Sequence, residues 1–363
     1  MTAHDIALQT LIDRVRGARA DRTPLNIIGG STKAFYGGQA RGLPLEVRPL
    51  TGITSYEPTE LVVTVRAGTP LAELEAALDE AGQCLPFEPP RYSPGGTVGG
   101  MVAAGLAGPG RPAVGGVRDY VLGATLLNGK AELMSFGGTV MKNVAGYDLS
   151  RLIAGSMGVL GVLCEVSLKV LPRPAAELTL RFEWPEDKAL AELQRWGAQP
   201  LPISASAWWN GMLVVRLAGA SAAVVAAAQR LGGEPVDESI GQPFWTGLRD
   251  HTDEFFQAAH QAVGTGATLW RLSLPVATPA IKLSGEHLVE WGGAQRWVVT
   301  TKPGASMRDL ATKAGGHATA FAGPKAGGVF HPLPAAEARI QRAVKAAFDP
   351  DGLFNPGRLY PDW

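Results

Sequence analysis

The sequence predicts an α+β protein with two domains, of which the first ends near residue 172. The 363 residues exceed the length of about 250 that one hydrophobic core usually holds. The sequence has 46 glycines, and those between Gly29 and Gly161 are clustered in short runs that strand and helix patterns separate. Later in the chain, apolar strands alternate with an alanine-rich helix, which is an α+β pattern with few glycine runs.

The first elements follow from local patterns. Leu25–Ile28 is typical of a short buried strand that ends in a glycine turn, and residues 60–66 alternate as a second strand. A helix should follow, with Thr69 as N-cap, Pro70 at its first position and Gly82 closing its end.

Further elements lead to the domain boundary and beyond it. Residues 126–130 predict a hairpin with a two-residue turn, and Gly161–Leu171 predicts an apolar strand. Pro172–Pro174 fixes an extended exit that marks the boundary. In the second domain we expect a strand at 212–217 and a helix at 221–231.

Composition excludes several classes of function. The 33 basic and 33 acidic residues cancel and form no basic run, so nucleic acid is not an expected partner. Cys84 and Cys164 suit buried free thiols in a reducing compartment, and two cysteines cannot hold a four-cysteine iron–sulfur cluster. We expect no signal peptide in Met1–Asp13, no membrane span and a cytoplasmic location, with membrane association through a partner left open.

Three glycine clusters carry the chemistry. The first, residues 28–38, leaves a strand and lets backbone N–H groups and hydroxyls approach a pyrophosphate, although alone it suits a mobile loop equally well. It matches neither the nucleotide-triphosphate loop nor the Rossmann fingerprint. The second, residues 94–105, and the third, residues 155–162, would let a flat ligand lie against the backbone, or would permit tight helix packing.

The order of these clusters, with Lys142–Leu149 before the third, resembles the FAD-binding domain of the vanillyl-alcohol-oxidase and p-cresol-methylhydroxylase (PCMH) flavoproteins. The run Asp349–Arg358 is similar to the closing Asn-Pro-Gly-Lys/Arg segment of that superfamily. Within it, residues of about 20 to 172 and the tail resemble the family of FAD-binding E subunits of glycolate oxidases.

The resemblance implies a two-domain, PCMH-type FAD-binding fold with a smaller α+β cap domain. Residues 1–172 would form the FAD-binding domain, and residues 173–325 a cap that serves as a substrate or interface domain. Residues 326–363 would return to the FAD domain.

The resemblance also implies a set of cofactor-binding residues. Those expected around the FAD pyrophosphate are Gly29, Gly30, Ser31, Thr32, Lys33, Phe35 and Gly37. Those expected beside the pyrophosphate and flavin are Thr97, Gly99 and Gly100. Those expected at the ribose and adenine are Asp119, Gly155, Gly158, Gly161 and Val162, the last through its backbone, while Arg358 would reach toward the flavin from the tail.

Departures from the superfamily pattern refine these expectations. Met101 stands where many relatives have asparagine, which leaves that flavin contact open. Relatives with covalent flavin use a histidine in the first loop, and this chain has none between His4 and His251. The FAD should therefore be non-covalent.

No catalytic residue and no metal site are predicted. Larger hydroxy-acid dehydrogenases of the superfamily have a histidine pair and a Glu-His-Gly run, which Glu286-His287-Leu288 matches only in part and which we interpret as a surface pair. His331 lies near the tail motif, but a lone histidine is more often structural; Arg271 could hold a carboxylate, but an ordinary solvated strand position suits it better.

The resemblance implies an FAD-dependent oxidoreductase that acts on the CH–OH group of a small 2-hydroxy acid, converting glycolate to glyoxylate by hydride transfer to flavin. Its expected partners are a larger FAD-binding subunit and an iron–sulfur subunit. Two alternatives stay open: a self-sufficient 2-hydroxy-acid dehydrogenase, and a non-catalytic assembly subunit that retains the fold.

Overall fold

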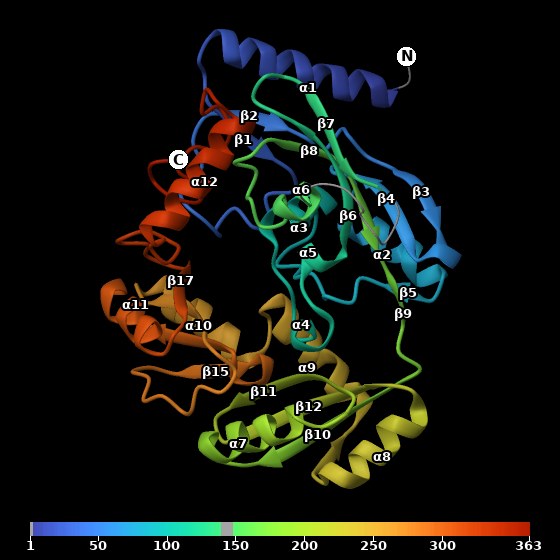
Figure 1. Ribbon diagram of the computed structural model, residues 1–363. Coiled ribbons are helices and arrows are strands. Elements are labelled where there is room, and N and C mark those ends of the chain that lie inside the picture. The colour runs from blue at the N-terminus through green and yellow to red at the C-terminus, as the bar shows by residue number, and fades with distance from the viewer. Residues whose placement is uncertain (1–2, 139–147) are drawn as a thin grey trace. The chain divides into compact units, whose positions relative to one another are not determined.

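The computed structural model describes residues 3–138 and 148–363, which divide into two compact units (Figure 1). The first unit consists of Met1–Leu106, Gly116–Pro172 and Pro332–Trp363. The second unit consists of Ala107–Gly115 and Arg173–His331. The short segment 107–115 therefore leaves the first unit, packs with the second and returns, which the sequence does not signal.

The first unit is built around an antiparallel sheet in the order β3-β4-β8-β6-β7. These strands are β3 (Ile53–Glu57), β4 (Val62–Arg66), β6 (Val121–Leu127), β7 (Leu133–Gly137) and β8 (Val162–Lys169). The predicted strands at 60–66 and 161–171 are thus confirmed, each starting one or two residues later than expected.

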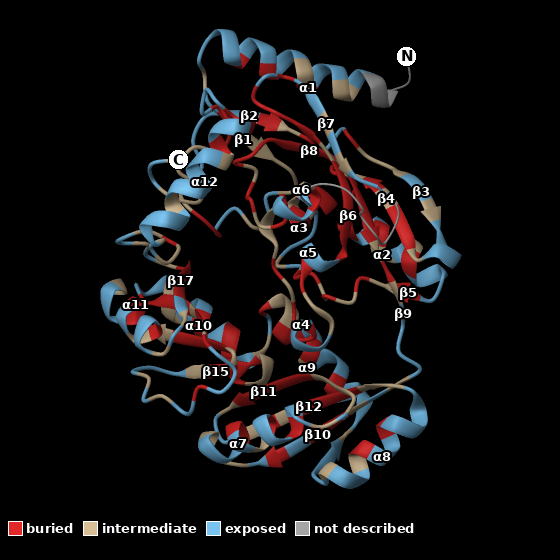
Figure 2. Cartoon of the chain, in the orientation of Figure 1, coloured by how far each residue is buried: buried red, intermediate tan, exposed pale blue. Residues whose placement is uncertain are grey.

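Strand β8 is apolar almost throughout because it lies in the middle of the sheet and is buried on both faces. Val162 and Cys164 pack on one face with apolar residues of α1 (Ala3–Ala20), whereas Leu163 lies on the other face. Burial raises the pKa of the Cys164 thiol to about 12. Figure 2 shows the corresponding concentration of buried residues along β8, β6 and β4.

A parallel pair, β1 (Leu25–Ile28) and β2 (Leu43–Glu46), forms a second layer of the first unit. The predicted strand at 25–28 is confirmed. The C-terminal tail extends this layer: the Leu25 N–H donates to the Leu353 carbonyl at 2.7 Å, and the Asn355 N–H donates to the Leu25 carbonyl at 2.9 Å. The two ends of the chain are therefore joined by backbone pairing.

The remaining elements of the first unit are short, apart from the helices α2 and α12. They are the 3₁₀ turn Pro58–Glu60, α2 (Leu71–Glu80), β5 (Gln83–Cys84), α3 (Val98–Ala104), α5 (Val117–Tyr120), α6 (Leu149–Leu152), β9 (Leu171–Pro172) and α12 (Ala335–Phe348).

Three local predictions need correction. Helix α2 has Pro70 as its N-cap, because the Thr69 hydroxyl instead accepts a hydrogen bond from the Gly52 N–H at 2.9 Å. The hairpin between β6 and β7 exists, but its loop spans residues 128–132, since the Asn128 side chain accepts from two N–H groups within it. Cys164 is a buried free thiol as expected, whereas Cys84 is a free thiol that is only partly buried.

The second unit contains an antiparallel sheet in the order β13-β10-β12-β11-β15-β16-β14-β17. Its strands are β10 (Ala176–Glu183), β11 (Ile203–Trp209), β12 (Met212–Gly219), β13 (Glu234–Val236), β14 (Thr268–Ser273), β15 (His287–Glu290), β16 (Gln295–Thr300) and β17 (His317–Ala322). Its helices are α4 (Arg111–Val114), α7 (Glu186–Gly197), α8 (Ser221–Leu231), α9 (Glu238–Asp250), α10 (Glu254–Gly264), the 3₁₀ turn Trp291–Gly293 and α11 (Gly304–Lys313). The predicted strand at 212–217 and helix at 221–231 are confirmed.

A buried charged pair holds the end of α12 in the first unit. The Lys345 ammonium donates to the Asp349 carboxylate at 2.5 Å and to the carbonyls of Val159 and Phe354 at 2.7 and 3.1 Å. The same carboxylate accepts the N–H groups of Leu353 and Phe354. Burial lowers the pKa of Lys345, and the Asp349 charge opposes that shift.

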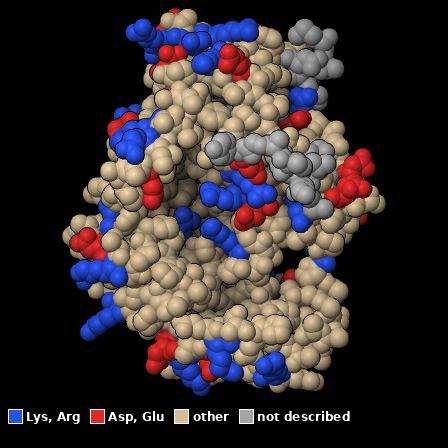
Figure 3. Space-filling model, viewed as in Figure 1, with Lys and Arg blue, Asp and Glu red and all other residues tan. Residues whose placement is uncertain are grey.

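Two features bear on partners. Among the described residues, no helix is long and apolar enough to cross a membrane, and no group of three or more His, Cys, Asp and Glu side chains could hold a metal ion. On the face drawn in Figure 3, basic and acidic side chains are mixed over both units.

Replacement of Lys345 by Met should lower the free energy of unfolding by about 3 kcal/mol, because it leaves the buried Asp349 carboxylate without its cation. Urea unfolding followed by circular dichroism measures the change. Lys313→Met, at an exposed position of α11, is the control. Equal urea midpoints for the two variants would show that the buried pair does not stabilise the tail.

Candidate functional site

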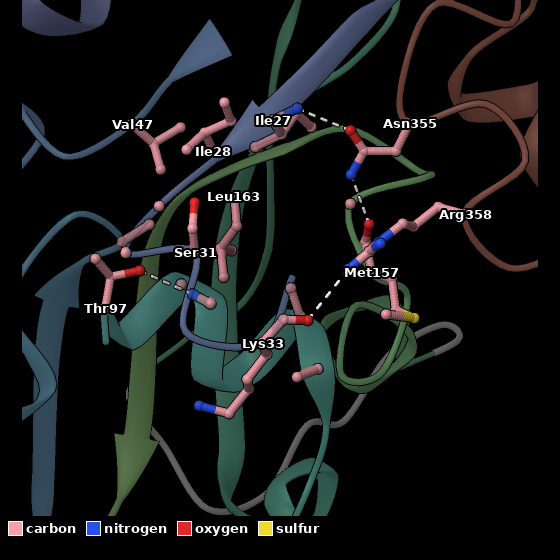
Figure 4. Close-up of a pocket in the computed structure, with 18 of the residues that line it drawn as sticks. Ile27, Ile28, Ser31, Lys33, Val47, Thr97, Met157, Leu163, Asn355 and Arg358 are labelled. Carbon is pink, nitrogen blue, oxygen red and sulfur yellow. Dashed lines mark hydrogen bonds between the residues drawn. The ribbon is translucent and has the colours of Figure 1, made fainter. Parts of the chain in front are cut away.

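A cavity opens in the first unit where β1 ends, and all three glycine clusters contribute to it (Figure 4). It contains about 1040 Å³ of empty space, part of which is open to solvent. Its apolar lining includes Ile27, Ile28, Val47 and Leu163, and its polar lining comes from the first loop, Thr97 and the tail. The cavity thus combines an apolar wall with polar groups in one open hollow, as cofactor sites usually do.

The first loop offers hydrogen-bond donors to the cavity. The backbone turns sharply at Ser31, whose φ is +55°. Among the residues that the structure describes, none accepts a hydrogen bond from the N–H groups of residues 29–32. Successive free N–H groups in such a loop form an anion-binding concavity, which suits a pyrophosphate.

Glycine is also required here by packing between the first two clusters. A Cβ on Gly30 would lie 1.7 Å from the Gly95 carbonyl oxygen, and one on Gly29 would lie 2.5 Å from Thr97 Oγ1. Thr97 itself caps α3, where its hydroxyl accepts the Gly100 N–H at 3.1 Å. The absence of side chains thus lets the first loop lie directly on the start of α3.

The tail closes the cavity from another direction through Asn355. Its Oδ1 accepts the Ile27 N–H at 2.8 Å, and its Nδ2 donates to the Met157 carbonyl at 2.7 Å. Gly158 must lack a side chain, because its φ is +76° and a Cβ would lie 2.6 Å from Asn355 Nδ2. One amide therefore joins β1 to the third glycine cluster.

Arg358 fixes the outer part of the first loop. Its guanidinium donates to the carbonyls of Gly38, Lys33 and Ala34 at 2.5, 3.2 and 3.0 Å, and burial lowers its pKa. The Gly38 N–H in turn donates to the Arg358 carbonyl at 2.8 Å. These hydrogen bonds hold Arg358 in place at the lining of the cavity.

These features fit FAD. Free N–H donors and the cations of Lys33 and Arg358 lie at the polar lining, where a pyrophosphate can be neutralised, and the branched side chains of β1 and β8 supply an apolar wall for a flat ring system. Lys33, in the first loop, has its Nζ 5.7 Å from the centroid of the Tyr92 ring.

Most of the predicted cofactor residues meet at this cavity. Those that line it are Gly29, Gly30, Ser31, Thr32, Lys33, Thr97, Gly99, Gly100, Gly158, Gly161 and Arg358.

The other predicted residues have different surroundings. Phe35 contacts Tyr92 edge-on, with ring centroids 5.4 Å apart, and Gly37 (φ +96°) packs against Met157 and Arg358. The Asp119 carboxylate accepts the Gly116 N–H at 2.8 Å. Gly155 (φ +84°) donates its N–H to Val102, and the Val162 side chain is buried on the opposite face of β8. These five residues are not among those that line the cavity.

Several lining residues have no individual signal in the sequence, among them Ile27, Met157, Leu163 and Asn355. Asn355 lies within the tail motif, which indicated the segment but not the role of this side chain. Of the motif Lys142–Leu149, residues 142–147 lie outside the described residues; Asp148 caps α6 by accepting the Arg151 N–H.

The other sequence candidates belong to the second unit and are not among the residues that line this cavity. Of the expected surface pair, Glu286 is exposed, whereas His287 is partly buried: it lies 3.1 Å from Glu186 and packs against Trp208. His331 Nδ1 lies 3.3 Å from the Ala318 nitrogen. Arg271 lies on β14, 5.7 Å from the Phe321 ring centroid.

The chain is similar to known proteins over nearly its whole length. A family model described as an FAD binding domain matches residues 8–147. Glycolate oxidase subunit GlcE of Escherichia coli (strain K12) is 49% identical over 98% of this chain and 97% of its own length. D-lactate dehydrogenase of Anaerostipes hadrus is 33% identical over 42% of this chain, and glycolate oxidase subunit GlcD of Bacillus subtilis (strain 168) 32% identical over 38%. The first of these two matches covers 31% of the D-lactate dehydrogenase, and the second covers 29% of the GlcD subunit.

A solved structure, alkyldihydroxyacetonephosphate synthase, superposes with a TM-score of 0.66 at 13% identity, covering 96% of this chain and 75% of that one. This likeness concerns the fold alone. Together with the family model it confirms the predicted PCMH-type α+β fold, and the family model and GlcE confirm FAD as the cofactor.

Substitution of Gly30 by Ala should weaken FAD binding at least about tenfold, because a Cβ 1.7 Å from the Gly95 carbonyl must push the first loop away from α3. Quenching of flavin fluorescence during titration measures the affinity. Gly197→Ala is the control, since a Cβ there meets nothing within 4 Å. Unchanged affinity in the Gly30 variant would show that the loop does not hold the cofactor.

Proposed function

The chain belongs to the GlcE family of glycolate oxidase subunits, and from this premise we propose that it is the FAD-binding subunit of a complex that oxidises glycolate to glyoxylate. The 49% identity over nearly the full length of both chains is the observation that carries the proposal. The cavity lined by the three glycine clusters supports it, since it combines donors for a pyrophosphate with an apolar wall.

We assign cofactor binding to residues 1–172, with residues 326–363 closing the cavity, and substrate or interface contacts to residues 173–325. FAD, when bound non-covalently, supplies the acceptor for the hydride of the CH–OH group. The backbone of residues 29–32 would hold the pyrophosphate, and Lys33 with Arg358 would balance its charge. The branched walls from β1 and β8 would exclude water from the ring.

We further propose that a larger FAD-binding subunit and an iron–sulfur subunit take the electrons onward. The similarity to the GlcD subunit of another glycolate oxidase supports a complex with unlike flavin subunits. Cys84 and Cys164, the two cysteines of the chain, cannot build a four-cysteine cluster, so the electrons would leave through a partner. Two free thiols also suit the reducing cytoplasm.

A self-sufficient dehydrogenase of 2-hydroxy acids is the second candidate, supported by the similarity of 42% of this chain to D-lactate dehydrogenase. An assembly subunit without flavin is disfavoured, because the loop N–H groups have no structural use among the described residues.

The chain purified alone should be yellow and should stay yellow under anaerobic glycolate or D-lactate, because it depends on its partner to complete the reaction. The flavin band near about 450 nm is the readout. Dithionite, which should bleach the band, is the control for a reducible flavin. Bleaching by either hydroxy acid would establish the self-sufficient enzyme, and a colourless protein that takes up no FAD would overturn the proposal.

A further inference from the structure

One end of the sheet in the second unit carries a row of polar side chains on a single face. His317 on β17 pairs with Ser273 at the end of β14, Ser273 with Gln295 at the start of β16, and Gln295 with Glu290 at the end of β15. Directly paired residues of antiparallel strands point to the same face. The row therefore crosses four neighbouring strands without changing sides.

Arg271 joins this face two residues before Ser273. It pairs with Thr319 and Trp297, and its guanidinium lies 5.7 Å from the Phe321 ring centroid. The alternate positions of β14, Trp270 and Leu272, point the other way into a core with α11. The half-buried guanidinium thus lies on the same face as the polar row, beside the buried aromatic rings of Trp297 and Phe321.

Arg111 reaches the same end of the sheet from the segment 107–115. Its guanidinium lies 4.7 Å from the ring of Trp291, the residue that follows Glu290. Trp291 Nε1 also donates to the Gly108 carbonyl at 3.2 Å, which fixes the segment there. Because the segment 107–115 packs with the second unit, it places the Arg111 cation beside the row.

Several basic groups act electrostatically on His317. Partial desolvation lowers the pKa of His317, and Arg271, His331 and Arg111 lower it further by repulsion. Glu290 is the carboxylate of the row, but it is buried, and its Oε2 accepts from Trp297 Nε1 at 2.6 Å and Gln295 Nε2 at 3.0 Å. Within the described part of the chain, Gln295 Oε1 has no hydrogen-bond partner.

We propose that this end of the second unit is a binding site for a small carboxylate anion, with Arg271 and His317 as its contacts and Arg111 at its rim. A guanidinium binds a carboxylate through paired N–H donors, and a bound anion relieves the repulsion among the clustered cations. A neutral imidazole can hydrogen-bond a hydroxyl next to the carboxylate.

The choice of glycolate as the probe rests on the proposed function. Calorimetric titration of glycolate into the full FAD-loaded chain should show saturable binding, and ethylene glycol, its neutral analogue, should not bind. Arg271→Gln and His317→Gln should each weaken glycolate binding by about tenfold or more, because each loses a hydrogen bond to the anion. Arg230→Gln, on the exposed side of α8, is the matched control.

Acetate separates two sources of the anion: equal affinity identifies a general carboxylate site, and a preference for glycolate identifies a hydroxy-acid site. Absence of glycolate binding, or binding by both variants as strong as in Arg230→Gln, overturns the proposal. His317→Gln changes an exposed side chain, so it keeps the test decisive if the Arg271 variant does not fold. Flavin absorbance of the same samples is independent: a yellow chain that binds no carboxylate refutes this site alone, whereas a colourless chain refutes the proposed function.

Discussion

The side-chain amide of Asn355 is the interaction on which the cofactor cavity depends. It accepts from Ile27 in β1, donates to Met157 in the third glycine cluster, and belongs to a tail that pairs with Leu25. A buried amide with both ends satisfied fixes the relative positions of the segments that it joins. The loop N–H groups and the apolar wall can form one cavity only because this amide holds β1 against that cluster.

The other constraints support this closure. Lys345 and Asp349 form a buried pair that receives two tail N–H groups and reaches the Val159 carbonyl. Arg358 then holds three carbonyls of the first loop. Because the cavity uses residues from both ends of the first unit, cofactor binding and the stability of the tail should be coupled.

The sequence predicted what depends on local pattern. The strand at 25–28, the helix at 221–231 and the glycine clusters follow from periodicity and backbone freedom. The role of Asn355 could not be predicted, since it depends on partners 328 and 198 residues away. The packing of 107–115 with the second unit likewise depends on a contact with Trp291, which is distant in sequence. Thr69 was wrongly predicted as an N-cap, because its hydroxyl accepts a hydrogen bond from the Gly52 N–H.

The affinity of Asn355→Ala for FAD tests the central claim most directly, with Asn210→Gly in an exposed turn of the second unit as control. Flavin fluorescence titration, made on protein shown to be folded by circular dichroism, should give a Kd raised about tenfold or more, because the loss of both hydrogen bonds lets β1 and the third cluster separate. A Kd equal to that of the control variant would contradict the account, since the cavity would then form without the tail.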